Sequence, residues 1–134
     1  MSLEIIPAYD HVQEILGLFD EYTRMLVGHD PSFQIYLDIQ NYEDEIKDLR
    51  HKYGPPDGRL YLALWEGEAA GCIALRRLGS DSCEMKRLYV RPEFRGRRIA
   101  DALVDRIISE ARLTGYSHML LDTLPFLELS LIHI

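Results

Sequence analysis

The stretch that decides the fold covers residues 90–100 and reads Val90-Arg91-Pro92-Glu93-Phe94-Arg95-Gly96-Arg97-Arg98-Ile99-Ala100. It joins the end of an apolar strand to the start of a long amphipathic helix through a turn that holds one glycine, Gly96. The first backbone N–H groups of a helix have no partner within it, and the helix dipole favours an anion beside them. Arg95, Arg97 and Arg98 add positive charge, and Gly96 leaves room for a ligand to approach. The stretch therefore predicts an anion site whose chemistry fits a pyrophosphate.

A strong helical pattern follows Pro92. Its apolar positions recur at intervals of three and four residues, at Ala100, Leu103, Val104, Ile107, Ile108 and Ala111. Gly115 is the expected C-cap, and residues 117–123 form an apolar run typical of a strand. Because a strand, a helix and a second strand usually make a right-handed crossover, we expect residues 83–91 and 117–123 to be parallel neighbours.

The preceding part of the chain predicts an antiparallel meander. Apolar runs at 60–65, 69–76 and 83–91 are separated by tight turns that contain glycine. Nearer the N-terminus we expect a strand at 3–7, a helix over about 12–26 capped by Asp10, and a second helix that begins after Asn41 and has Ile46 and Leu49 on its inner face. The sheet is therefore mixed, and the fold class is α/β or α+β.

Composition places this fold in a single globular domain with an uneven charge distribution. The chain has 134 residues, 47% of them hydrophobic, with 15 basic and 22 acidic residues and a net charge of −7. Residues 76–98 nevertheless contain eight basic and three acidic side chains. A compact basic region in an acidic chain favours a small anionic ligand and argues against nucleic acid. A small RNA-binding domain is also disfavoured because no aromatic platform clusters there.

Several other classes of protein are disfavoured by the sequence. Cys72 and Cys83 are out of register in the expected hairpin, which is typical of reduced thiols in a cytoplasmic protein. No apolar run approaches the ~18 residues of a transmembrane helix, so we expect no membrane partner, and we see no secretory signal. The five histidines include no pair at i, i+4, and there is no Cys-x-x-Cys, so no metal site is predicted.

Residues 95–100 resemble the acyl-CoA pyrophosphate loop of the GNAT superfamily of N-acyltransferases, whose motif is Gln/Arg-x-x-Gly-x-Gly/Ala. Arg95 matches the first position and Ala100 the last, whereas Arg98 stands where the motif has its central glycine. The resemblance extends from Leu3 to about Phe126. It implies one acetyltransferase-like domain over residues 1–126, with helices on both faces of the sheet.

The resemblance also implies a function, the transfer of an acetyl group from acetyl-CoA to a primary amine by direct attack. Acetyl-CoA would be bound by Arg95, Gly96, Arg97, Arg98, Ile99 and Ala100, and by main-chain groups of Leu88, Tyr89 and Val90. The Val90 N–H would polarise the thioester carbonyl. Glu84 is the candidate general base, and strand alternation predicts that it shares a face with Lys86, Leu88 and Val90. The acceptor, a small-molecule or peptide amine, would bind near residues 27–41.

Simpler interpretations compete with these roles. Glu84 could be a solvated strand residue paired with Arg87 or Lys86, and the arginines could be an exposed basic helix start. The acidic run 43–45 is expected to be a solvated helix face, and Tyr89 to serve in packing.

The C-terminal residues depart from the family pattern. The family continues after the parallel strand with a helix, which usually carries a tyrosine acid, and a further strand, but no tyrosine follows Tyr116. We therefore expect residues 127–134 to be an atypical tail and strand 117–123 to have an open edge, which would favour a homodimer. The alternative function is a non-catalytic CoA-binding or interaction module.

Overall fold

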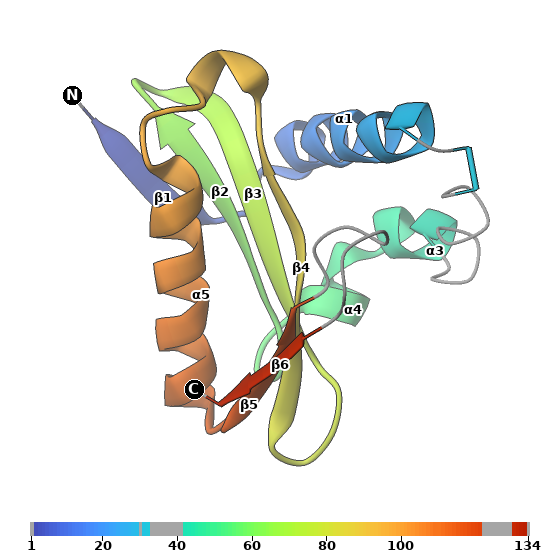
Figure 1. The fold of residues 1–134 in the computed structure, drawn as a ribbon, viewed down its shortest axis with the longest axis vertical. Coiled ribbons are helices and arrows are strands. Elements are labelled where there is room, and N and C mark those ends of the chain that lie inside the picture. The colour runs from blue at the N-terminus through green and yellow to red at the C-terminus, as the bar shows by residue number, and fades with distance from the viewer. Residues whose placement is uncertain (1, 30, 33–41, 122–129, 134) are drawn as a thin grey trace.

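A computed structural model describes residues 2–29, 31–32, 42–121 and 130–133 (Figure 1). Within them, six strands form one sheet in the order β1-β2-β3-β4-β5-β6. Their bounds are β1 Leu3–Pro7, β2 Arg59–Trp65, β3 Glu68–Arg77, β4 Ser82–Val90, β5 His118–Leu121 and β6 Ser130–His133. β4 and β5 are parallel, and the other neighbouring pairs are antiparallel. The predicted mixed sheet, with its meander and its crossover, is confirmed.

Helices cover both faces of this sheet, as expected (Figure 1). The helices are α1 Val12–His29, α3 Tyr42–Lys47, α4 Leu49–Tyr53 and α5 Ile99–Thr114, with a 3-10 turn, η1, at Pro92–Phe94. α5 lies alone on one face in Figure 1, and α1, α3 and α4 lie on the other. Among the described residues, every helix is too short or too polar to span a bilayer.

The helix α5 forms where its apolar spacing predicts. Ile99, Leu103, Ile107 and Ala111 are all buried against the sheet. Each such aliphatic side chain contributes about 1.5–3 kcal/mol when fully buried, less for alanine. The helix ends at Gly115, whose φ of 107° places it in the left-handed region that favours glycine, and its N–H donates to the Ala111 carbonyl. α5 is thus a rigid support for the turn that precedes it.

The opposite face has its own core, in which α1 packs on β3 and β4 and contributes Ile15, Leu18 and Phe19. The two cysteines belong to different cores, Cys72 beneath α1 and Cys83 beneath α5, and both are free thiols. The expectation that they do not face each other is confirmed.

The second predicted helix is divided in two. α3 ends at Lys47, and α4 begins after Asp48, whose carboxylate accepts a hydrogen bond from the His51 N–H at 3.2 Å. An aspartate side chain that bonds to nearby backbone competes with helix continuation, so the prediction of one continuous helix was wrong.

The outer edge of β5 is paired, which corrects the expectation of an open edge. β6 runs antiparallel to β5, with His118 opposite His133 and Leu121 opposite Ser130. Because β6 pairs with this edge, an open edge no longer supports a homodimer. The homodimer itself stays a prediction. The helix that the family pattern places after the parallel strand would fall in residues 122–129, which lie outside the described residues.

Candidate active site

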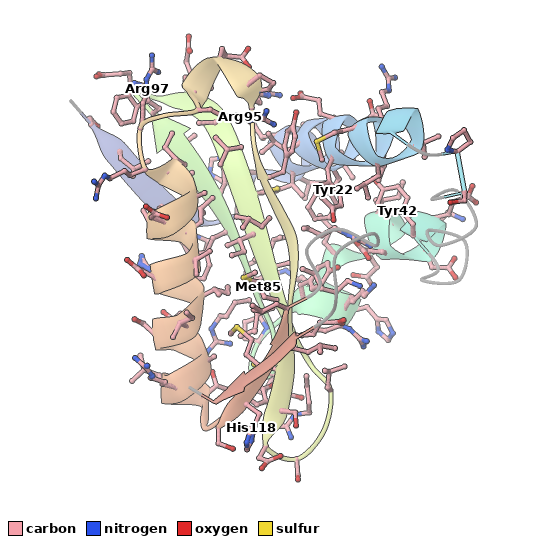
Figure 2. The ribbon with its side chains drawn as sticks, in the orientation of Figure 1. Tyr22, Tyr42, Met85, Arg95, Arg97 and His118 are labelled. Atoms are coloured by element: carbon pink, nitrogen blue, oxygen red, sulfur yellow. The ribbon has the colours of Figure 1, made fainter. Side chains whose placement is uncertain are left out.

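Within the described residues, β5 accompanies only the first part of β4. The parallel pairs run from Ser82 and His118 to Met85 and Leu121, whereas the pairing of β4 with β3 continues to Val90. Figure 2 shows Met85 between His118 at one end of the sheet and Arg95 and Arg97 at the other. Beyond Met85, the edge of β4 that faces away from β3 has no strand beside it among the described residues.

The backbone groups on this edge can be assigned from the hydrogen bonds at the end of β4. The Arg91 N–H donates to the Ala70 carbonyl of β3 at 2.8 Å. Because antiparallel residues alternate between facing the partner and facing away, the N–H and C=O groups of Leu88 and Val90 point away from β3. The Val90 carbonyl there accepts a hydrogen bond from Arg95 Nε at 3.1 Å.

A bulge at Arg87 reverses the side-chain order along β4. Arg87 has a φ of 60°, and the register with β3 shifts between Cys72 and Ala74. Leu88 and Val90 consequently pack on the α5 side. Cys83 and Met85 face α5 as well, so Glu84 points to the opposite side. The prediction that Glu84 shares a face with Leu88 and Val90 was wrong, because the extra residue of the bulge shifts the alternation by one.

The turn between η1 and α5 is exposed from Arg95 to Arg98. Gly96 has a φ of 83°, and a Cβ placed on it would meet nothing within 4 Å, so its backbone conformation rather than crowding accounts for the glycine. Arg98 adopts the left-handed conformation, with φ 59° and ψ 25°. A glycine takes this conformation freely, which gives a physical reason for the central glycine of the motif.

The start of α5 has the character of an anion site. Its N-cap, Arg98, makes no side-chain hydrogen bond to the helix, so the N–H groups of the first turn are not capped by it. Arg97 is anchored above the rings of Trp65 and Phe94, at 5.1 and 5.6 Å from their centroids. The Ile99 side chain is buried in the core, so Ile99 offers a ligand its backbone N–H, whereas Ala100 is exposed.

The end of β4 is fixed to α1 by a second group of contacts. Arg91 Nε lies 3.0 Å from both carboxylate oxygens of Glu21, and Arg91 Nη1 donates to the Ala69 carbonyl at 2.9 Å. The ring of Tyr89 packs edge-on against Tyr22, with 6.3 Å between ring centroids. These contacts support the packing interpretation of the Tyr89 side chain, and they hold the end of β4 against α1.

Glu84 is buried and held through one of its two carboxylate oxygens. Oε1 accepts from Arg76 Nε at 2.6 Å and lies 3.8 Å from Lys86 Nζ. The simpler interpretation named Lys86 or Arg87 as partner, and the structure gives Arg76 and Lys86. Both of these contacts engage Oε1 rather than Oε2. The carboxylate is therefore oriented through Oε1, and Oε2 is the oxygen that can accept a proton without breaking them.

Glu84 lines a pocket of about 870 Å³ on the α4 side of the sheet. Its walls come from α3 and α4, the loop 54–58, and the ends of β3 and β4 that carry Arg76 and Glu84. The pocket thus reaches β4 beside the residues that pair with β5. The acceptor region expected at residues 27–41 lies mostly outside the described residues.

A buried ion pair behind this pocket was missed by the sequence analysis. Glu45 binds Arg87 through two hydrogen bonds of 2.9 Å, and Lys52 Nζ lies 2.6 Å from Glu45 Oε1. Both Glu45 and Arg87 are almost fully buried, which contradicts the expected solvated face for Glu45. Its position four residues before the inward-facing Leu49 was the signal that could have revealed it.

The aromatic neighbours of this pair explain how the bulge is held. The Arg87 guanidinium lies 5.8 Å from the ring centroid of Tyr22 and 5.5 Å from that of Tyr42. Figure 2 shows these two tyrosines near each other, between α1 and α3. Burial raises the pKa of Glu45, but the hydrogen bonds and charge of Arg87, together with the charge of Lys52, outweigh it, so the pKa lies below its usual value.

Comparison with known proteins agrees with this geometry. The model of the acetyltransferase (GNAT) family matches residues 17–130. An uncharacterized N-acetyltransferase of Schizosaccharomyces pombe is 43% identical over 110 residues, which cover 81% of this chain and 68% of that protein.

Solved structures show the same fold. A GNAT-family acetyltransferase of Staphylococcus aureus has a TM-score of 0.70 at 21% identity, over 91% of this chain and 73% of that one. An N-acetyltransferase of Thermoplasma acidophilum, solved in complex with coenzyme A, has a TM-score of 0.67 at 17% identity, over 90% of this chain and 79% of that one.

Proposed function

Because the chain belongs to the acetyltransferase (GNAT) family, we propose that it transfers the acetyl group of acetyl-CoA to a primary amine. The observation that carries the proposal is the course of β4. Within the described residues, β5 accompanies β4 only as far as Met85, the backbone groups of Leu88 and Val90 lie on the edge of β4 that faces away from β3, and β4 ends at the basic turn before α5. We propose residues 1–126 as the domain that performs this transfer.

The described residues fit both the pyrophosphate and the pantetheine amides of acetyl-CoA. The first turn of α5 supplies backbone N–H groups, and Arg95, Arg97 and Arg98 supply exposed positive charge; together they would hold the pyrophosphate. The main-chain groups of Leu88 and Val90 would bind the pantetheine amides. Bound there, acetyl-CoA supplies an activated thioester at the edge of β4.

Glu84 is the proposed general base. The neutral amine forms a C–N bond to the acetyl carbon as the C–S bond breaks, and the surplus amine proton passes, directly or through one water, to Glu84 Oε2. Arg76 is a positioning residue in this scheme, because it holds Oε1 at 2.6 Å. The thiolate takes its proton from water, which is feasible because a thiol has a pKa of about 8.5.

Thiol release from acetyl-CoA over a panel of amines tests this function. Glu84→Gln is expected to lower kcat by about 10²–10⁴-fold, the usual contribution of a general base, with acetyl-CoA affinity unchanged. Glu43→Gln, on the exposed side of α3, is the matched control and should behave as the parent chain. Acetyl-CoA binding without thiol release on any amine would instead support a non-catalytic CoA-binding module.

A further inference from the structure

The pocket beside Glu84 is strongly polar. Among the described residues, five acidic and five basic side chains line it together with His51, and the others are glycines and prolines. No aliphatic or aromatic side chain other than proline and histidine is among the described residues that form its walls. An aliphatic or aromatic amine would lose its hydration there without gaining apolar contacts. The pocket suits a small hydrophilic molecule that carries charges of its own.

The charged groups at the inner wall of this pocket form ion pairs. At its inner wall, two buried carboxylates are each shared by two cations: Glu45 by Arg87 and Lys52, and Glu84 by Arg76 and Lys86. Of these four cations, Lys52, Arg76 and Lys86 line the pocket and Arg87 lies behind it, so within the described part of the chain cations outnumber carboxylates at this wall.

The acids nearer the rim are already engaged or exposed. The Asp48 carboxylate caps α4, and Asp57 lies 3.3 Å from Arg77, while Asp44 is exposed. The inner wall thus favours a negative group on a ligand, and Glu84 Oε2 is left to meet a proton donor.

We propose that the acetyl acceptor is a small amine that also bears a carboxylate. Its carboxylate would contact Lys52 and Arg76, whose side chains line the pocket and are 18% and 36% exposed. Its amine would then face Glu84 Oε2, where the pocket reaches β4. This inference rests on the proposed acetyl transfer, and it places a polyamine at a disadvantage because its second cation would meet the basic wall.

Matched pairs of amines test the carboxylate directly. We would compare 4-aminobutyrate with butylamine, and L-alanine with ethylamine, by thiol release from acetyl-CoA. The inference predicts a kcat/KM at least tenfold higher for the carboxylate-bearing member of each pair. Equal values within the pairs, or a preference for spermidine, would overturn it.

A binding measurement separates this inference from the proposed reaction. Calorimetric titration of the chain saturated with CoA, which cannot transfer an acetyl group, should show tighter binding of 4-aminobutyrate than of butylamine. If that preference holds while no amine releases thiol, the pocket assignment stands and the proposed function fails. If both amines bind equally, the pocket assignment fails whatever the turnover.

Two lysine variants localise the effect. Lys52→Gln is expected to raise the KM for 4-aminobutyrate about tenfold and to leave that for butylamine unchanged, a difference that general loss of structure would not produce. Lys47→Gln, on α3 and exposed but outside the pocket lining, should change neither KM. An equal effect of Lys52→Gln on both amines would contradict the proposed contact.

Discussion

Replacement of Arg98 by glycine should stabilise the protein. Arg98 is exposed, lies in the left-handed region at φ 59° and ψ 25°, and makes no capping hydrogen bond with its side chain. That conformation costs an L-residue roughly 1–2 kcal/mol. Glycine avoids this cost but loses more conformational freedom on folding, which destabilises the glycine variant by roughly 0.5–1 kcal/mol. The net gain for Arg98→Gly is therefore about 0.5–1 kcal/mol, or roughly 2–4 °C in Tm for a domain of this size.

Urea unfolding of the parent chain, Arg98→Gly and Arg98→Ala measures this gain. Alanine removes the guanidinium but keeps a Cβ at the same backbone angles, so Arg98→Ala should show none of the stabilisation. If the alanine variant were as stable as the glycine variant, the effect would come from removing a charge beside Arg95 and Arg97, and the explanation from backbone strain would be refuted.

Three further predictions concern the buried groups. Glu45→Gln should destabilise the chain by about 3–5 kcal/mol in urea unfolding, because it leaves the Arg87 charge buried without its carboxylate; a loss below about 1 kcal/mol would show that this pair does not support the fold. The pKa of Glu45 lies below its usual value of 4.5, so its ionisation stabilises the fold above that pH, and this contribution is lost as the pH falls further. The free energy of unfolding should therefore decrease less steeply toward acid pH in Glu45→Gln than in the parent chain. Identical pH dependence in the two chains would contradict the assignment. Burial raises the pKa of Cys72 to about 12 and that of Cys83 to about 11. Iodoacetamide at pH 8 should therefore label neither thiol until urea is added. Rapid labelling of the folded chain would be inconsistent with the buried positions of these thiols.

The parts of the fold that rest on local patterns could be predicted from the sequence. The spacing from Leu103 to Ala111 and the cap at Gly115 define α5 almost to the residue. The runs of β2, β3 and β4 with their short turns required an antiparallel meander, and the crossover rule then placed β5 parallel to β4. The anion site at the turn around Gly96 was predicted from the start of a helix and its neighbouring arginines, and it stays a prediction.

The features that were missed depend on contacts between distant segments. The bulge at Arg87 is held by Glu45, which is 42 residues away in the chain, and no periodicity in β4 announces it. The face of Glu84 was therefore assigned correctly only relative to Lys86. The break at Asp48 was local, but it was hidden because Ile46 and Leu49 continue the helical spacing across it. β6 has too few residues for a strand pattern to stand out from its apolar surroundings.

The affinity of the chain for acetyl-CoA, measured by calorimetry, tests the central claim most directly. The parent chain would be compared with Gly96→Asp, at the proposed pyrophosphate site, and with Gly115→Asp, at the other end of α5. Both glycines have positive φ, and a Cβ placed on either would meet nothing within 4 Å, so the two variants carry similar backbone strain. The account predicts that Gly96→Asp loses at least tenfold in affinity and that Gly115→Asp binds as the parent does. Unchanged affinity in Gly96→Asp, or equal losses in both variants, would contradict the placement of acetyl-CoA at the start of α5.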